Sequence, residues 1–200
     1  MLYFLSYVVC YIFLVLFCGL KVKGKENIPK KGSFIIASNH TSYFDPPVLA
    51  IGCFPRIINF VGKEELFKVK FLRWYFSKAG CIPLKRNYSD FRAIKLCIRK
   101  LKEGSVLAIF PEGERSVDGK IGEGQPGVGF LAAKTAVPVV PAYIFGTNKL
   151  LPKGAKKIKI TKIFLIFGKP LYFDSKKDKD YVKISDTIMQ AIKNLADNLS

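Results

Sequence analysis

The chain has 200 residues, half of them hydrophobic, which is enough for one domain with a core and excludes a disordered chain. An excess of 33 Lys and Arg over 15 Asp and Glu gives a formal charge of +18 and predicts an acidic partner: phospholipid head groups, nucleic acid or a phosphorylated substrate. Five cysteines without a CxxC pair and a single histidine favour neither a disulfide framework nor a metal site.

The first 20 residues, MLYFLSYVVCYIFLVLFCGL, contain no charged side chain. A helix of about 20 residues rises roughly 30 Å, which is the thickness of the hydrocarbon core of a bilayer. Residues 1–20 are therefore predicted to form a membrane-anchoring helix, which either crosses the bilayer or lies in one leaflet. The segment lacks the basic start and the small residues of a cleavable signal peptide. Five lysines between residues 21 and 31 place the remaining chain on the cytoplasmic face of the membrane.

Apolar runs and amphipathic segments then alternate along residues 21–200. Short apolar runs predict strands at residues 33–37, 56–61, 106–110, 137–145 and 157–167. Apolar residues at helical spacing predict helices at residues 89–103, 127–136 and 180–199. Pro138 and Pro141 interrupt the fourth predicted strand and favour an edge position or a bulge. The predicted fold class is α/β, a single layered domain with a mixed, mostly parallel sheet covered by helices.

Residues 67–78, FKVKFLRWYFSK, interleave basic and aromatic side chains. The basic ones are Lys68, Lys70, Arg73 and Lys78. Such a pattern is typical of a helix that lies at a membrane surface, where aromatic rings enter the lipid and lysines meet acidic head groups. Packing of the aromatic rings in the protein core is the alternative interpretation.

The only histidine, His40, directly follows the predicted strand 33–37 and stands five residues before Asp45. A turn at the end of a strand can bring these two side chains together. A carboxylate held against one ring nitrogen fixes the imidazole tautomer and supports positive charge when the other nitrogen takes a proton. Taken alone, a single histidine also fits a simple hydrogen bond within a loop.

Two further clusters contain arginine. Arg115 lies in FPEGERS, which follows the predicted strand 106–110, and ligands gather at such strand ends in α/β sheets. Its planar guanidinium donates two hydrogen bonds to a phosphate at once. Lys85 and Arg86 end the stretch GCIPLKR. Without context, these cations fit equally well as solvated surface charges.

Four stretches, in this order, resemble the sequence blocks of the glycerolipid acyltransferase family, most closely its bacterial 1-acyl-sn-glycerol-3-phosphate acyltransferases. They are NHTSYFD at residues 39–45, GCIPLKR at 80–86, FPEGERS at 110–116 and VPVVPA at 137–142. The resemblance covers residues 21–147 and implies that residues 21–200 form an acyltransferase domain. It has one departure, because the family has Thr or Ser where this chain has Glu114. An extra carboxylate beside Arg115 would weaken anion binding unless it points away.

The resemblance implies transfer of a fatty acyl group from acyl-CoA or acyl carrier protein to the sn-2 hydroxyl of 1-acyl-glycerol-3-phosphate (lysophosphatidic acid), giving phosphatidic acid for phospholipid biosynthesis. No cofactor beyond the acyl donor, no metal and no nucleic acid are expected, and membrane phospholipid is an expected partner. His40 and Asp45 are the implied catalytic pair, with His40 as the general base. The implied substrate-binding residues are Arg86 and Arg115 at the phosphate, together with Glu112, Gly113 and Lys63. Glu112 either contacts the glycerol end or holds the loop.

Other functions remain as alternatives. Within the family, the acceptor could be another lysolipid or glycerol-3-phosphate. Outside it, a non-catalytic basic protein that binds nucleic acid or lipid would explain the charge, although a nucleic-acid module leaves residues 1–20 without a purpose. Ser42 and Cys81 are the nucleophiles of a covalent mechanism, but the single histidine leaves each without a second base. Backbone amides of residues 39–42 are the expected donors to the tetrahedral oxygen.

Overall fold

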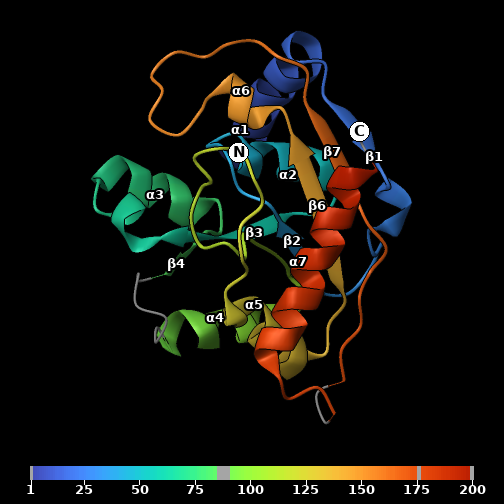
Figure 1. Cartoon of the computed structure of the whole chain (residues 1–200). Coiled ribbons are helices and arrows are strands. Elements are labelled where there is room, and N and C mark those ends of the chain that lie inside the picture. Colours follow the sequence, from blue (N-terminus) through green and yellow to red (C-terminus); the bar gives the residue numbers. More distant parts are fainter. Residues whose placement is uncertain (1, 85–90, 175–176, 199–200) are drawn as a thin grey trace.

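The computed structural model describes residues 2–84, 91–174 and 177–198 (Figure 1). A seven-stranded sheet with strand order β1-β7-β6-β2-β5-β3-β4 lies at its centre. The strands are β1 (Lys21–Lys23), β2 (Phe34–Ser38), β3 (Ile58–Lys63), β4 (Ile82–Leu84), β5 (Val106–Ile109), β6 (Val139–Phe145) and β7 (Phe164–Phe167). Neighbouring strands are parallel except for β6 and β7, which are antiparallel. The α/β class with a mixed, mostly parallel sheet is therefore confirmed.

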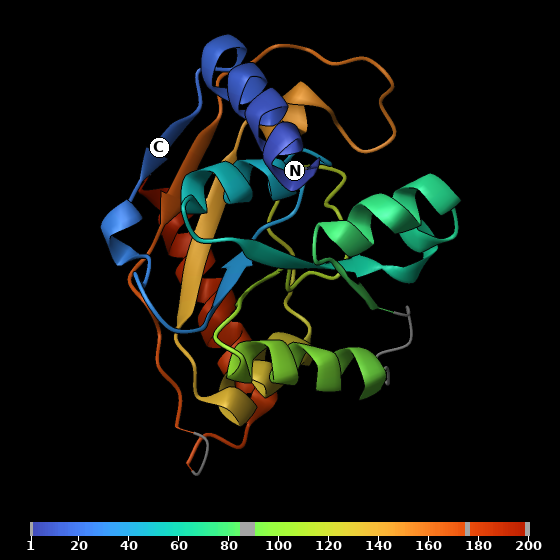
Figure 2. The same cartoon turned by 180° about the vertical axis from the view of Figure 1, so that it is seen from behind.

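Helices cover both faces of the sheet (Figures 1 and 2). The α-helices are α1 (Leu2–Tyr11), α2 (Asp45–Cys53), α3 (Lys70–Lys78), α4 (Phe91–Lys102), α5 (Pro126–Thr135), α6 (Thr147–Leu150) and α7 (Tyr181–Asp197). Shorter helical segments are the π-helical η1 (Ile12–Phe17) and the 3₁₀ helices η2 (Lys25–Asn27) and η3 (Glu64–Phe67). The predicted helices at residues 89–103, 127–136 and 180–199 thus correspond to α4, α5 and α7.

Strand β2 shows how the two faces are filled. All of its residues are buried, and their side chains alternate between the faces because the side-chain period of a strand is two residues. Phe34 and Ile36 join the core cluster that contains residues of η1 and α2. Ile35 and Ala37 join the cluster built from α4, α5 and α7. A continuously apolar strand of this kind belongs in the middle of a covered parallel sheet, and that is where β2 lies.

Strand β6 corrects the prediction of an edge position. It pairs with β2 on one side and with β7 on the other. The carbonyl of Pro141 accepts a hydrogen bond from the Gly168 N–H, so the missing N–H of this proline also falls on the β7 side. On that side the register changes by one residue, from Ala142 opposite Phe167 to Val139 opposite Leu171, as in a β-bulge. Proline therefore removes no bond to β2, and an interior strand tolerates it.

The lysine-rich residues before β7 correct a second boundary. Residues 157–167 were expected to form one extended strand, but only Phe164–Phe167 pair within the sheet. Ile158 and Ile160 are exposed, so their alternation with lysine is not the signature of a buried strand face. Instead, residues 151–162 form an irregular segment between α6 and β7.

The N-terminal helix differs from the prediction of a single helix over residues 1–20. Helix α1 ends at Tyr11 and continues as η1, in which Leu14 is buried in the protein core, as is Cys18 just beyond it. Within the described residues, no helix combines the length and the apolar character that crossing a bilayer demands. The prediction that residues 1–20 form a helix crossing the bilayer is therefore unsupported. Composition could not show this, because it does not say which apolar residues pack inside.

Helix α3 lies beside the sheet at the β3–β4 end (Figure 2). Phe71 and Trp74 are 67% and 49% exposed, whereas Phe67, just before the helix, is buried. Core packing therefore accounts for Phe67 but not for Phe71 and Trp74. Large exposed rings on a basic helix are the pattern expected at a lipid surface.

Candidate active site

The candidate site lies at the carboxyl ends of the parallel strands β2 and β5. Residues 39–45 follow β2 and lead into α2, and residues 110–116 follow β5. These strands are hydrogen-bonded neighbours in register, so the two segments leave the sheet side by side. Ligands bind at this edge in α/β sheets because the loops there are free to carry polar groups.

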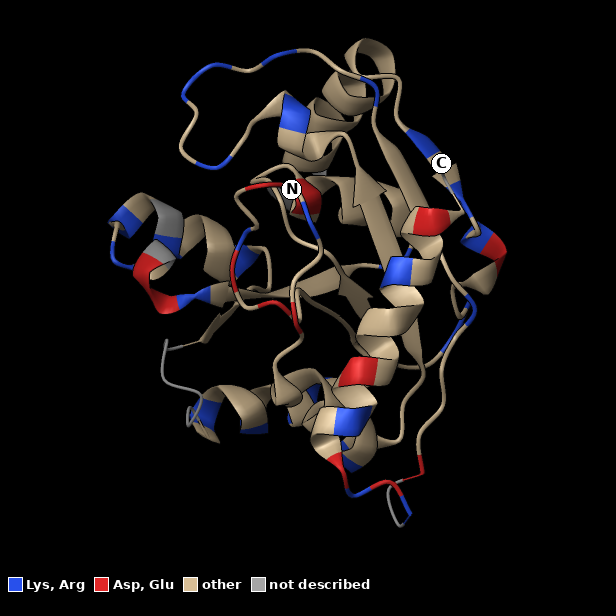
Figure 3. Ribbon diagram, viewed as in Figure 1, with Lys and Arg blue, Asp and Glu red and all other residues tan. Residues whose placement is uncertain are grey.

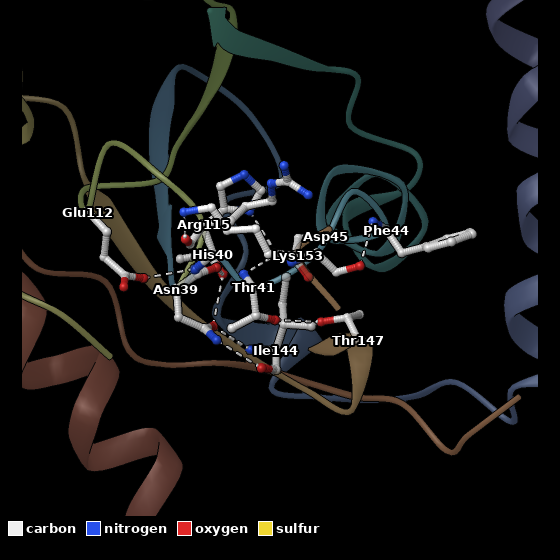
Figure 4. A network of polar contacts seen from close by, with 12 residues as sticks. Asn39, His40, Thr41, Phe44, Asp45, Glu112, Arg115, Ile144, Thr147 and Lys153 are labelled. Atoms are coloured by element: carbon white, nitrogen blue, oxygen red, sulfur yellow. Dashed lines mark hydrogen bonds and ion pairs between the residues drawn. The ribbon is translucent and has the colours of Figure 1, made fainter. Parts of the chain in front are cut away.

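The predicted contact between the only histidine and its carboxylate is present. His40 Nδ1 lies 2.8 Å from Asp45 Oδ2 (Figure 4). The same oxygen accepts hydrogen bonds from the backbone N–H groups of Thr41, at 2.7 Å, and Ser42, at 2.8 Å. An ionised carboxylate only accepts, so the proton in the ring contact belongs to Nδ1. In the neutral imidazole with this tautomer, Nε2 is the nitrogen that can act as a base.

The imidazole ring is also held from one face. Phe110 stacks on it with ring centroids 4.0 Å apart and an angle of 16° between the planes. Phe110 comes from the segment after β5, whereas His40 follows β2. The ring is thus fixed by a neighbouring segment as well as by its own turn. Sequence reasoning did not single out Phe110, although it is the first residue of the FPEGERS stretch.

A network of buried hydrogen bonds fixes the turn itself (Figure 4). The side-chain amide of Asn39 donates to the carbonyl of Ile144 and accepts from its N–H, which ties the turn to β6. The Thr41 hydroxyl lies 3.0 Å from that of Thr147 at the start of α6. These contacts join residues that are far apart in the sequence, so the spacing within the motif could not predict them.

Glu112 has both carboxylate oxygens occupied by backbone donors. Oε1 accepts from the N–H of His40 at 2.9 Å, and Oε2 accepts from the N–H of Gly122 at 3.0 Å. Burial raises the pKa of Glu112 above its ordinary value, while these two hydrogen bonds oppose the rise. Of the two expected roles, the geometry supports holding the loop rather than contacting glycerol.

The amide donors of the turn are committed to the protein. The N–H of His40 binds Glu112, and those of Thr41 and Ser42 bind Asp45. These amides are among the expected donors to the tetrahedral oxygen, and in this structure each of the three already donates to a carboxylate. The cause is that one short turn cannot both fix the carboxylate and offer the same donors to a substrate.

The other predicted binding residues divide between the cleft and the undescribed part of the chain. Lys63, Gly113 and Arg115 line the same cleft as His40. Gly113 has φ +75°, a conformation that favours glycine and allows the loop to turn. Arg86 lies outside the described residues, so its assignment to phosphate stays a prediction.

Arg115 is positioned by an aromatic ring. Its guanidinium carbon lies 3.6 Å from the centroid of the Tyr43 ring, a cation–π contact that holds the guanidinium plane in place. Nη1 is buried and has no hydrogen-bond partner within the part of the chain that the structure describes. A donor in this state is prepared for an anionic ligand.

The cleft beside His40 has a volume of about 870 Å³. Its walls come from α1, α2, α3, β3 and the segment after β5, together with Lys153 from the segment 151–162. Apolar side chains such as Phe60, Phe76 and Ile109 line much of it, and charged ones, among them Lys63, Arg115 and Lys153, line it as well. A cavity of this kind accepts a ligand with an apolar chain and an anionic head group.

The two candidate nucleophiles of a covalent mechanism are unsuited to it. The Ser42 hydroxyl donates to the carbonyl of Leu151 at 2.9 Å and accepts from the N–H of Phe44. Burial raises the pKa of the Cys81 thiol to about 12, so the thiolate is scarce near neutral pH. Across the described ranges, no three His, Cys, Asp or Glu side chains are grouped to hold a metal ion.

Known proteins share both the sequence pattern and the fold. The model of the family described as Acyltransferase matches residues 19–145. The chain is 32% identical over 188 residues to a Bacillus subtilis 1-acyl-sn-glycerol-3-phosphate acyltransferase, a match that covers 90% of each protein. It is 35% identical over 156 residues to a chloroplastic enzyme of that name from Brassica napus, covering 76% of this chain and 44% of the relative. This chain thus spans less than half the length of the plant relative.

A solved structure gives the same result in three dimensions. The 1-acyl-sn-glycerophosphate acyltransferase of Thermotoga maritima superimposes with a TM-score of 0.73 at 34% identity, covering 88% of this chain and 72% of that one. The matched family region begins before β1 and ends with β6, so it contains the His40–Asp45 turn and the Arg115 loop. The chain therefore belongs to the acyltransferase family.

Proposed function

We propose that this protein is a 1-acylglycerol-3-phosphate O-acyltransferase. It would transfer a fatty acyl group from acyl-CoA or acyl carrier protein to the sn-2 hydroxyl of lysophosphatidic acid and form phosphatidic acid. The observation that carries the proposal is the 2.8 Å contact between His40 Nδ1 and Asp45 Oδ2 beside a cleft that Arg115 also lines. The names of the Bacillus, Brassica and Thermotoga relatives support the choice of acceptor.

The proposed reaction is direct transfer through a general base. Nε2 of His40 takes the proton of the acceptor hydroxyl as the hydroxyl oxygen attacks the thioester carbonyl carbon. The carbon–sulfur bond then breaks, the thiolate leaves, and it takes the proton from the imidazolium. Proton and electron pairs balance without an acyl-enzyme, which agrees with the occupied Ser42 hydroxyl and the high pKa of Cys81.

Asp45 serves this reaction by position and by charge. It is fully buried, and one of its oxygens receives the ring N–H and two backbone N–H groups. These donors hold the carboxylate in one place, so the imidazole is kept in the tautomer that leaves Nε2 free. The negative charge also stabilises the imidazolium that forms when Nε2 is protonated.

The acceptor phosphate is proposed to bind at the guanidinium of Arg115. Its buried Nη1 supplies a donor that no described protein atom uses, and stacking on Tyr43 fixes the direction of the fork. Lys63 is a second cation on the cleft wall, at the end of β3. Arg86 is kept as a proposed phosphate ligand on the strength of the sequence resemblance.

We further propose that the enzyme works at the cytoplasmic surface of a membrane, with the exposed face of α1 lying in one leaflet. Helices α1 and α3 contact one another, and residues of both line the cleft. Exposed apolar side chains on them, including Leu5, Val9, Phe71 and Trp74, would enter the lipid. Helix α3 and the segment 151–162 lie on the same side of the molecule (Figure 3), and the basic residues of α3 would meet acidic head groups.

A direct assay tests the proposal. Purified protein in mixed micelles is incubated with lysophosphatidic acid and either acyl-CoA or acyl carrier protein carrying the same acyl group, and phosphatidic acid is measured. Product is expected with wild type and not with His40→Ala. A panel of other lysolipids and glycerol-3-phosphate identifies the acceptor. Absence of product from every acceptor, with folded protein, would contradict an enzymatic function.

A further inference from the structure

A lysine outside every motif reaches into the candidate site. Lys153 belongs to the irregular segment 151–162, and it lines the cleft together with His40 and Arg115. Its Nζ lies 3.3 Å from Glu114 Oε2 and donates a hydrogen bond of 3.0 Å to the backbone carbonyl of Arg115 (Figure 4). Lys153 therefore contacts the loop that carries the proposed phosphate ligand.

The start of this segment is anchored to the catalytic turn. The hydroxyl of Thr147, at the start of α6, lies against that of Thr41, and the carbonyl of Leu151 accepts a hydrogen bond from the Ser42 hydroxyl. Lys153 follows two residues later. Because the chain just before Lys153 is held against the catalytic turn, the position of the Lys153 ammonium group in the cleft is set by these contacts.

The ion pair between Lys153 and Glu114 is easily exchanged. The two side chains are 33% and 68% exposed, and pairs accessible to water contribute little stability. A phosphate monoester carries a charge of about −1.5 to −2 at neutral pH, more than one carboxylate does. Lys153 has three N–H donors, so it can keep its bond to the Arg115 carbonyl while a second N–H moves to another acceptor.

We propose that Lys153 binds the phosphate of the acceptor together with Arg115, and that Glu114 is an internal competitor that holds the lysine when no acceptor is bound. The inference rests on the proposed function and names a specificity determinant for it. It also gives a role to the residue at which this chain departs from its family. In the structure, Glu114 pairs with Lys153.

A purely structural role for the same ion pair makes the opposite prediction for one variant. If the pair only fastens the segment 151–162 to the Arg115 loop, then removing either charge loosens the loop. Glu114→Gln and Lys153→Gln would then both raise the KM for the acceptor. If Glu114 competes with phosphate, Glu114→Gln lowers that KM while Lys153→Gln raises it.

The experiment measures KM and kcat for lysophosphatidic acid and for the acyl donor in the full chain. Lys153→Gln is expected to raise the acceptor KM by roughly tenfold, the effect of losing one hydrogen bond between charged groups, with kcat and the donor KM within about twofold of wild type. Glu114→Gln is expected to lower the acceptor KM by about two- to threefold, since the competing pair is weak. Lys153→Arg, which keeps the charge, should restore most of the affinity.

Two controls complete the test. Lys156→Gln removes the same charge from the same exposed segment and should leave the acceptor KM unchanged. In the double variant Glu114→Gln/Lys153→Gln, the acceptor KM should equal that of Lys153→Gln alone, because Glu114→Gln lowers the KM only by freeing Lys153. With 1-monoacylglycerol, which lacks the phosphate, as the acceptor, wild type and Lys153→Gln should give the same rate.

The outcomes separate this inference from the proposed function. A wild-type protein that acylates no lysophosphatidic acid contradicts the function itself. An active wild type in which Glu114→Gln and Lys153→Gln change the acceptor KM in the same direction, or in which Lys153→Gln behaves like Lys156→Gln, overturns the role of Lys153 alone.

Discussion

The two ends of the candidate site are built differently. At the catalytic end, residues 39–45 form one short turn whose polar groups are mostly buried and bonded to fixed partners. At the phosphate end, Arg115, Glu114 and Lys153 are partly exposed and come from loops after β5 and α6. The first arrangement suits proton transfer, which requires constant geometry. The second suits an anion that must enter and leave.

The sharpest test of the catalytic end is His40→Ala. Loss of a positioned general base is expected to lower kcat by roughly 10²- to 10⁴-fold. The melting temperature should fall, because the variant removes a ring that is only 18% exposed and stacked on Phe110, but the protein should stay folded since the backbone contacts of the turn remain. Steady-state kinetics and a melting curve on the same preparation check both expectations. A kcat near that of wild type would remove the general-base assignment.

Asp45→Asn separates the shape of the turn from its charge. An amide oxygen still accepts from the N–H groups of Thr41 and Ser42, but it no longer supports positive charge on the imidazole. We expect kcat to fall by roughly 10²-fold or more, with KM for both substrates unchanged. A fall in kcat accompanied by a large fall in the melting temperature would instead indicate that Asp45 mainly holds the fold.

Arg115→Ala probes the opposite end. Removing the stacked guanidinium should raise the acceptor KM by about tenfold or more, with a smaller effect on kcat. Arg115→Lys keeps the charge but not the planar fork, so it should recover only part of the affinity. The acceptor KM and the donor KM are measured for wild type and for both variants. A rise in the donor KM alone would assign Arg115 to the acyl donor.

Glu112→Gln tests the connection between the two ends. Gln has only one accepting oxygen, so either His40 N–H or Gly122 N–H loses its partner, and the free energy of unfolding should fall by about 1–3 kcal/mol. Because burial raises the pKa of Glu112 above 4.5, the folded protein takes up a proton at a higher pH than the unfolded chain. Wild type should therefore gain stability relative to the variant as the pH falls through this raised pKa. Urea unfolding at several pH values measures the difference.

The smallest effect is expected at Cys81. With a pKa raised to about 12, its thiol should react slowly with iodoacetamide near neutral pH, even though the residue lines the cleft. Cys81→Ala should keep the acyltransferase rate within about twofold, since no step uses the thiol. A rate loss comparable with that of His40→Ala would revive a covalent mechanism.

Much of the fold was readable because its signals are local. The strands predicted from the apolar runs at β2 and β5, and the helices predicted from the apolar spacing at α4 and α7, agree with the observed bounds to within a few residues. The errors came from tertiary context. Pro141 does not mark an edge, because its missing N–H points away from β2, toward the side where the register changes by one residue. The lysine-alternating residues before β7 have the periodicity of a strand but are not paired in one.

By itself, the sequence determined the mixed α/β class, the His40–Asp45 spacing and the order of the motifs that indicated an acyltransferase. These depend on neighbours a few residues apart, where backbone geometry leaves few options. Tertiary structure alone decided that Phe110 stacks on His40, that Glu112 holds the turn, and that Lys153 reaches the Arg115 loop. Each of those contacts joins residues distant in the chain, and only the packing of the strands and loops brings them together.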